Sequence, residues 1–182
     1  MRRPVVLLLL SFSIPALLLA DEQADAVKAL EKIGVRVRVD KKSGAALKVD
    51  SVGKAVADDQ LKHLAAMPKV KQLFLSGVKN ADAKYAPKQI GDKGLAHIAE
   101  LTELRELQID GANVTDAGLK HLQKLKLLEI LNLTSTRVSD EGMKILAELK
   151  KLRTVDLANT KVTDKGIAEL KKALGPDANV RK

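Results

Sequence analysis

The residues best suited to chemistry in this chain are Asp116 and His121, which stand five positions apart in the segment NVTDAGLKHL, residues 113–122. A carboxylate beside an imidazole can bind a metal ion or take part in proton transfer. The three histidines of the chain, His63, His97 and His121, occupy matching positions of successive repeats, so stacked repeats would place them in one column. A metal ion held by this column is one interpretation. We favour a repeated position without a chemical role, because no carboxylate accompanies all three histidines.

Aspartate recurs with the same regularity. When each repeat is counted from its first residue, such as Leu104, an aspartate stands at position 13, directly before a segment with helical periodicity. A catalytic residue is needed only once, so an aspartate in each repeat favours a structural role. A carboxylate there can accept hydrogen bonds from unpaired helix N–H groups and meet the positive end of the helix dipole, for about 1 kcal/mol per cap. Glycine two positions later predicts close approach by a neighbouring backbone. We therefore predict structural helix caps at Asp58, Asp92, Asp116, Asp140 and Asp164.

The repeat that carries these residues has a period of 24. Three copies fill residues 104–175 without a gap, each with apolar residues at positions 1, 4, 6, 11, 16, 19 and 22. A fourth copy begins at Val70 and contains a ten-residue insertion within 76–89, and a fainter fifth begins near Ala46. In each copy, alternating apolar residues predict a short strand, and a stripe with three- and four-residue spacing predicts a helix.

This pattern strongly resembles the leucine-rich repeat family, specifically a bacterial group with a T-x-V-T-D-x-G-L core that is similar to ribonuclease-inhibitor-like repeats. The resemblance covers residues 46–182, about five repeats. It implies an α/β solenoid with short parallel strands on a concave face and helices on a convex face. Upstream, residues 21–45 predict a helix at 24–33 and then a hairpin, which together would cap the exposed core edge of the first repeat.

Residues 1–20 have the layout of a secretory signal peptide, because a basic start precedes an apolar run at 5–19 and acidic sequence follows. We expect cleavage after Ala20, with cleavage after Ala26 as the alternative. Retention as a membrane anchor is less favoured, because the apolar run is shorter than the roughly 20 residues that span a bilayer. The prediction is an exported protein, periplasmic or extracellular, with no stable membrane span after cleavage.

The composition excludes several classes of function. The chain has no cysteine, which removes disulfides, thiolate nucleophiles and Cys-based metal sites. Its formal charge of +9 comes mostly from lysine, whereas nucleic-acid readers favour clustered arginine with stacking aromatics. The sequence also lacks the usual motifs for acyl transfer, zinc proteolysis and phosphate binding. We therefore predict no enzyme activity, no cofactor, no metal site and no nucleic-acid partner.

A binding surface is the remaining expectation. Side chains at repeat positions 3, 5 and 7 would point outward from the concave face, and two of them, Phe74 and Ile130, are apolar. The single tyrosine lies in the insertion beside them, although this insertion could equally be a surface loop without function. The alternative ligand is an anionic envelope polymer or glycan bound by the lysine-rich surface, which strong salt dependence would reveal. We predict an interface for an unidentified protein partner at Phe74, Tyr85, Gln108, Asp110, Ile130, Asn132 and Asp156.

Overall fold

A computed structural model describes residues 14–51, 54, 56–75 and 90–182, with side chains from residue 20 onward. Short strands alternate with helices, two of which are 3-10 helices and carry the letter η. The elements in chain order are α1 (Ile14–Lys32), β1 (Arg36–Val39), β2 (Ala46–Asp50), η1 (Asp58–Ala66), β3 (Gln72–Phe74), α2 (Asp92–Ile98), β4 (Glu106–Gln108), α3 (Asp116–Leu119), η3 (Lys120–Lys124), β5 (Ile130–Asn132), α4 (Asp140–Leu146), β6 (Thr154–Asp156), α5 (Asp164–Leu174) and β7 (Asn179–Arg181).

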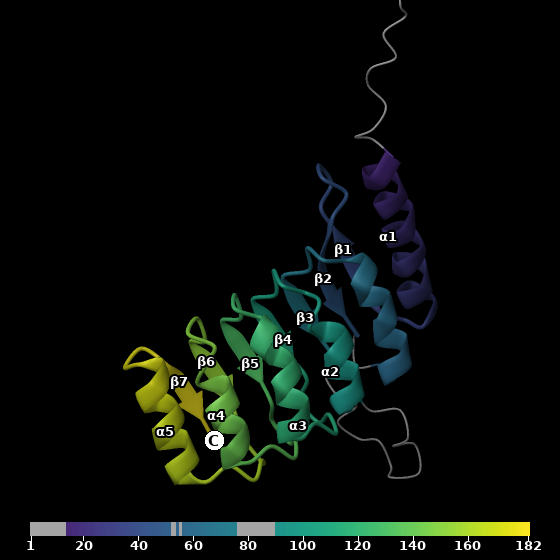
Figure 1. The fold of residues 1–182 in the computed structure, drawn as a ribbon. Helices are drawn as coiled ribbons and strands as arrows, with labels where there is room; N and C mark the ends of the chain where they lie inside the picture. The colour runs from purple at the N-terminus through teal and green to yellow at the C-terminus, as the bar shows by residue number, and fades with distance from the viewer. Residues whose placement is uncertain (1–13, 52–53, 55, 76–89) are drawn as a thin grey trace, which may run out of the picture.

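All described strands belong to one open sheet, in which spatial order follows chain order from β1 to β7. The strands from β2 to β7 are parallel, and only β1 pairs antiparallel, with β2. Figure 1 shows the resulting curved solenoid, with the strands side by side and the helices stacked along the other layer. The predicted architecture of short parallel strands backed by helices is therefore confirmed.

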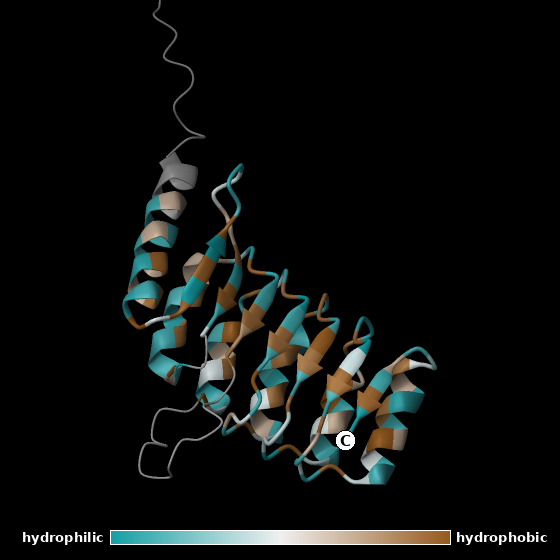
Figure 2. Ribbon diagram, turned by 180° about the vertical axis from the view of Figure 1, so that it is seen from behind, coloured by the Kyte–Doolittle hydropathy of each residue, from teal (hydrophilic) through white to brown (hydrophobic). Residues whose placement is uncertain are grey.

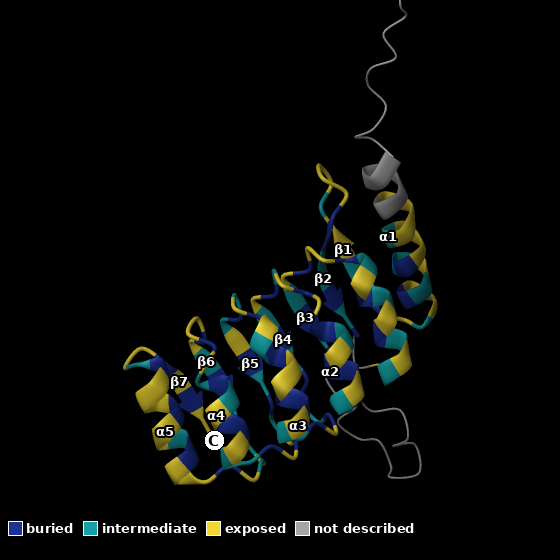
Figure 3. Ribbon diagram, viewed as in Figure 1, coloured by how far each residue is buried: buried dark blue, intermediate teal, exposed yellow. Residues whose placement is uncertain are grey.

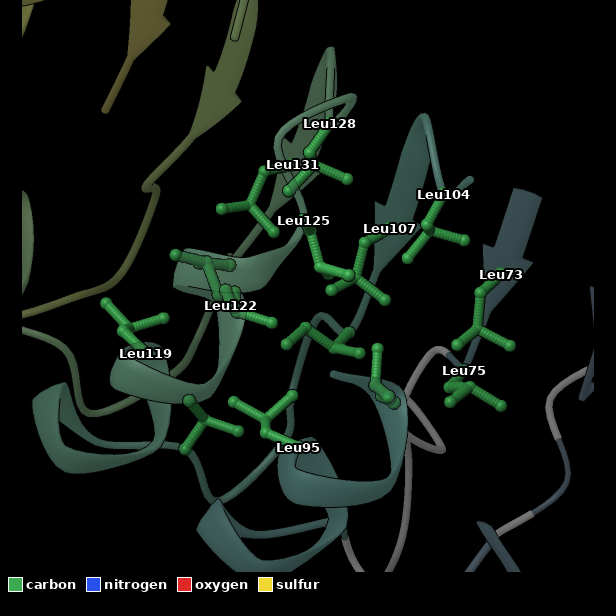
Figure 4. Packing of buried hydrophobic residues seen from close by; sticks show 14 of the residues in the cluster. Leu73, Leu75, Leu95, Leu104, Leu107, Leu119, Leu122, Leu125, Leu128 and Leu131 are labelled. Carbon is green, nitrogen blue, oxygen red and sulfur yellow. The ribbon is translucent and has the colours of Figure 1, made fainter. Parts of the chain in front are cut away.

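The core runs between the two layers as a stack of aliphatic side chains. Leu73, Leu107 and Leu131 are register partners on β3, β4 and β5, and all three are fully buried. Leucines from the helices meet them from the other side, among them Leu95 and Leu122 (Figure 4). Because one repeat cannot bury its own stripe, each repeat depends on its neighbours for stability. The buried and exposed faces of the helices separate accordingly (Figure 3).

The N-terminal cap differs in extent from its prediction. The helix expected at 24–33 is part of α1, which begins at Ile14. Gln23 ties α1 to the hairpin, since its Nε2 donates to the Gly44 carbonyl at 2.7 Å and its Oε1 accepts from the Ala46 N–H at 3.1 Å. Leu30 is buried in the core. Strand β2 pairs with β3, so the hairpin extends the repeat sheet.

The aspartates at position 13 do not cap their own helices, and that prediction is wrong. Each is the first helical residue, and the cap is the residue before it, such as Thr115. The carboxylate instead reaches to the next repeat: Asp92 accepts from the Thr115 N–H at 2.8 Å and from its hydroxyl at 2.7 Å. Asp116 accepts the same two bonds from Ser139, and Asp140 accepts them from Thr163. We call this series the aspartate ladder.

The ends of the ladder show the same geometry with fewer partners. Among the described residues, Asp58 accepts from one backbone N–H, that of Gly91 at 2.7 Å, because the next repeat has this glycine where Thr115, Ser139 and Thr163 each supply a hydroxyl. Asp164, in the last repeat, is exposed and pairs with Lys182 at 3.2 Å. The carboxylates therefore link neighbouring repeats, and a first-turn position near the helix dipole adds to their stability.

The aspartate ladder also explains the recurring glycine. A Cβ added at Gly118 would overlap the Asp92 carboxylate and would lie 3.1 Å from the Asp92 Cα. Gly94, Gly142 and Gly166 face the aspartate of the preceding repeat in the same way. The predicted close approach is correct, but the neighbouring group is chiefly a carboxylate side chain.

Candidate interface on the concave face

The strand register arranges the outward side chains of the concave face in two rows that cross the sheet. One row joins Arg38, Lys48, Gln72, Glu106, Ile130, Thr154 and Asn179, and the other joins Arg36, Asp50, Phe74, Gln108, Asn132, Asp156 and Arg181. Figure 2 shows this sheet in front of the helices. Basic residues gather at the β1–β2 end, whereas β4 to β6 carry amide, hydroxyl and acidic groups. Arg181 adds a positive charge on β7, so the face is acidic in its centre and basic towards both ends.

Phe74 lies near the β1–β2 end of the face. The Lys48 ammonium stands 4.0 Å from the centre of its ring, a cation–π contact, and lies 3.9 Å from an Asp50 carboxylate oxygen. Such a contact is worth roughly 0.5–1 kcal/mol at a partly exposed site. The Phe74 side chain is half-buried, so part of the ring remains open to a partner.

Glu106 organises the centre of the face. Its two carboxylate oxygens each accept an amide N–H bond of 2.8 Å, one from Gln72 on the preceding strand and one from Gln108 on the same strand. Gln108, predicted from the sequence as a contact residue, is thus fixed by an intramolecular bond. Hydrogen bonds to a charged acceptor are stronger than neutral ones, so this network is well ordered.

The predicted residues on β5 and β6 lie on the same face. Ile130 is 37% exposed, and it and Val39 are the large apolar side chains that stay exposed among the described residues. Asn132 is half-buried, and its side-chain oxygen accepts from the Thr134 N–H at 2.9 Å. Asp156 is half-buried opposite Arg181. Asp110 is half-buried in the turn that follows β4.

Sequence reasoning and structure differ over the extent of this surface. Tyr85 lies outside the described residues, so its place in the interface stays a prediction. Lys48 and Glu106 were missed as organising residues. Lys48 belongs to a repeat too faint for its outward positions to be assigned, and the role of Glu106 depends on pairs formed across strands. The two arginines of β1 were missed because the sequence left open whether the hairpin pairs with the repeat sheet.

The histidines occupy equivalent places in the last turns of η1, α2 and η3. His63 and His97 are half-buried and His121 is exposed. Within the described part of the chain, no three His, Cys, Asp or Glu side chains gather closely enough to hold a metal ion.

Comparison with known proteins gives a direct match for the repeat. A family model described as leucine-rich repeat matches residues 121–147, which include β5 and α4, and residues 148–171, which include β6 and most of α5. The chain therefore contains leucine-rich repeats. Such repeats generally form protein-binding modules. Among curated protein sequences, none matches the chain.

Solved leucine-rich repeat structures resemble the chain at low identity. An internalin from Listeria monocytogenes is 20% identical over 66% of this chain and 37% of its own, with a TM-score of 0.46. A leucine-rich repeat protein from Leptospira interrogans is 22% identical over 65% of this chain and 27% of its own, with a TM-score of 0.44. The receptor kinase SOBIR1 ectodomain from Arabidopsis thaliana is 14% identical over 88% of this chain and 90% of its own, with a TM-score of 0.46. The chain thus spans about a third of the two bacterial proteins or less.

None of the helices that the structure describes combines the length and the apolar character needed to cross a bilayer.

Proposed function

We propose that this leucine-rich repeat protein is exported and acts as a protein-binding module through the concave face of its sheet. The observation that supports this most strongly is that a half-buried aromatic, Phe74, and an exposed aliphatic residue, Ile130, lie on one face on either side of a hydrogen-bonded polar centre. Buried anchors surrounded by satisfied polar groups are typical of the residues that dominate binding energy in protein interfaces.

The size of the face limits what it can do alone. Seven strands at about 4.8 Å spacing span roughly 29 Å, so the outward side chains offer only a few hundred Å². A standard interface needs about 800 Å² from each partner. A tight complex therefore requires neighbouring loops, and the insertion at 76–89 with Tyr85 is our proposed contributor.

Export forms the second part of the proposal. The apolar run at 5–19 has the layout of a signal peptide. The side chains that attach α1 to the repeat domain, Gln23, Ala26 and Leu30, all follow Ala20. Cleavage after Ala20 would keep these contacts, whereas cleavage after Ala26 would remove two of the three residues.

Photo-crosslinking tests the interface while the partner is still unidentified. A photoreactive amino acid replaces Ile130 on the concave face or, as a control, Ala96, which is exposed on helix α2. We expect one protein to be crosslinked from position 130 and not from position 96. The purified partner is then titrated with the native protein and with Phe74→Ala, after equal thermal stability of both is shown.

The titration with Phe74→Ala is the decisive measurement. Truncation of an interface anchor costs about 2 kcal/mol or more, so the affinity of Phe74→Ala should fall about 30-fold. A partner crosslinked equally from Ala96, or one whose affinity is unchanged by Phe74→Ala, would place the interface elsewhere.

A further inference from the structure

One edge of the solenoid forms where each helix ends and the chain turns into the next strand. We call this edge the basic rim. It lies along the upper side of the repeats in Figure 1, because the strands point downward from it. The Lys71 N–H donates to the Leu47 carbonyl at 2.9 Å, at the start of β2, so the hairpin turn that precedes β2 lies on the same edge. The basic rim comprises residues 40–45, 63–71, 95–105, 121–129, 143–153 and 171–178.

The basic rim accounts for the positive charge of the chain. It contains thirteen lysines and arginines against six acidic residues, a net charge of +7. Residues 21–182 carry +7 in total, because the chain has +9 and residues 1–20 hold two arginines and no acid. The remainder of 21–182 is therefore neutral overall. The basic residues of the rim are Lys41, Lys42, Lys69, Lys71, Arg105, Lys124, Lys126, Lys144, Lys150, Lys151, Arg153, Lys171 and Lys172.

Some of these charges have a structural role. The Lys150 ammonium donates to the Ala147 carbonyl at 2.6 Å and the Ala173 carbonyl at 3.4 Å, at the ends of α4 and α5. A cation there is favoured by the negative end of the helix dipole. Lys124 pairs with Glu100 at 2.9 Å. These contacts stabilise the fold and explain part of the charge.

Other rim charges have no such role. Lys69, Lys126 and Lys151 are exposed, lie in turns outside the helices, and have no charged partner among the described residues. Lys126 and Lys151 stand in neighbouring repeats, and Lys69 stands two repeats before Lys126 on the same edge. Neighbouring repeats are about 5 Å apart at the strands and about 8–10 Å apart at the helices. Unpaired charges held in a row suit a ligand with charges repeated along its length.

We propose that the basic rim binds a linear anionic polysaccharide with repeated carboxylate or sulfate groups. Of the two exposed large apolar side chains in the described chain, Ile130 lies on the concave face and Val39 borders the rim beside Ser43 and Lys69. A folded protein partner is less suited, because protein interfaces are depleted in lysine and have an apolar centre. Single-stranded nucleic acid is also less suited, since its binding uses aromatic side chains for stacking. This site is separate from the concave face, so either proposal can fail without the other.

Charge reversal on the two edges provides matched variants. The rim variant is Lys126→Glu/Lys151→Glu. The control is Lys93→Glu/Lys161→Glu, which makes the same change in net charge at exposed residues near the helix N-termini on the opposite edge. Binding of fluorescein-labelled polygalacturonate to the purified exported protein is measured by anisotropy, with dextran sulfate as the sulfated probe and neutral dextran as the blank. Far-ultraviolet circular dichroism confirms that both variants fold.

The proposal predicts that the rim variant binds polygalacturonate or dextran sulfate about ten-fold more weakly, and that the control stays within about two-fold of the native protein. The logarithm of the native affinity should also fall linearly with the logarithm of salt concentration. Equal weakening of both variants, or no binding by the native protein, would overturn it. Tighter binding of poly-L-glutamate than of either polysaccharide at equal charge would assign the rim to an acidic protein and also overturn it.

Discussion

Replacement of Gly118 by alanine tests the aspartate ladder directly. Gly118 is the third residue of α3, where alanine is normally the better residue by about 1 kcal/mol. The structure predicts the opposite result. The new Cβ would occupy the space of the Asp92 carboxylate, and the Asp92 Cα, at 3.1 Å, leaves little room for retreat. The carboxylate would have to leave Thr115.

The expected loss can be worked out from the bonds that Asp92 makes. Two hydrogen bonds to a charged acceptor, of 2.8 and 2.7 Å, are each worth about 1.5–3 kcal/mol. Taking the lower value because the site is only partly buried, and subtracting the helix preference of alanine, gives a net loss of about 2 kcal/mol. For a chain of this size, such a loss lowers Tm by about 4–8 °C.

A double-mutant cycle separates this mechanism from a general intolerance of the helix to alanine. The free energy of unfolding in urea is measured for the native protein, Gly118→Ala, Asp92→Ala and the double variant. Because Asp92→Ala already removes the carboxylate, adding Gly118→Ala should then cost little, and the two single effects should fail to add by about 2 kcal/mol. Additive effects, or a stabilising Gly118→Ala, would refute the ladder as the reason for glycine.

Two further predictions concern acid stability and processing. The Thr163 hydroxyl, followed by its N–H, holds the pKa of Asp140 below its usual 3.8, so the bond stabilises the fold above that pH and is lost as pH falls through the lowered value. Thr163→Val should therefore reduce the free energy of unfolding in urea more at pH 7 than at pH 3, and a loss equal at both would contradict this. The intact mass of the exported protein should correspond to cleavage after Ala20. A chain that begins after Ala26 should unfold at a lower urea concentration, because it lacks Gln23. Equal stability of both forms would contradict the role of that contact.

The repeat pattern was sufficient to predict the architecture. A 24-residue period with two internal spacings identifies strand, helix and stacking direction together, since no single unit can bury its own stripe. The two ends of the sheet were harder to predict. Strand β7 and the pairing of the hairpin through β2 depend on long-range hydrogen bonds between segments without a clear repeat pattern. Such contacts have no periodic signal in the sequence.

The role of the recurring aspartate was misassigned for a similar reason. Within one repeat, an aspartate at a helix start is indistinguishable from a cap. Its true partner, such as Thr115 for Asp92, stands 23 residues away and becomes adjacent only when repeats stack. The recurring glycine indicated a closely packed neighbouring group, because glycine is less favourable than alanine inside a helix. Only the structure shows that the neighbour is the carboxylate of the preceding repeat.

Departure from the repeat is the better guide to function in this fold. Recurring positions, the aspartate in all five units and the glycine in four of them, hold the units together. The side chains proposed to bind a partner are those that vary: Phe74 and Ile130 occupy outward positions where other repeats have polar residues. The lysines of the basic rim likewise change from unit to unit, as at Lys126 and Lys151. A regular scaffold thus fixes the spacing of groups, and its irregular positions supply their chemistry.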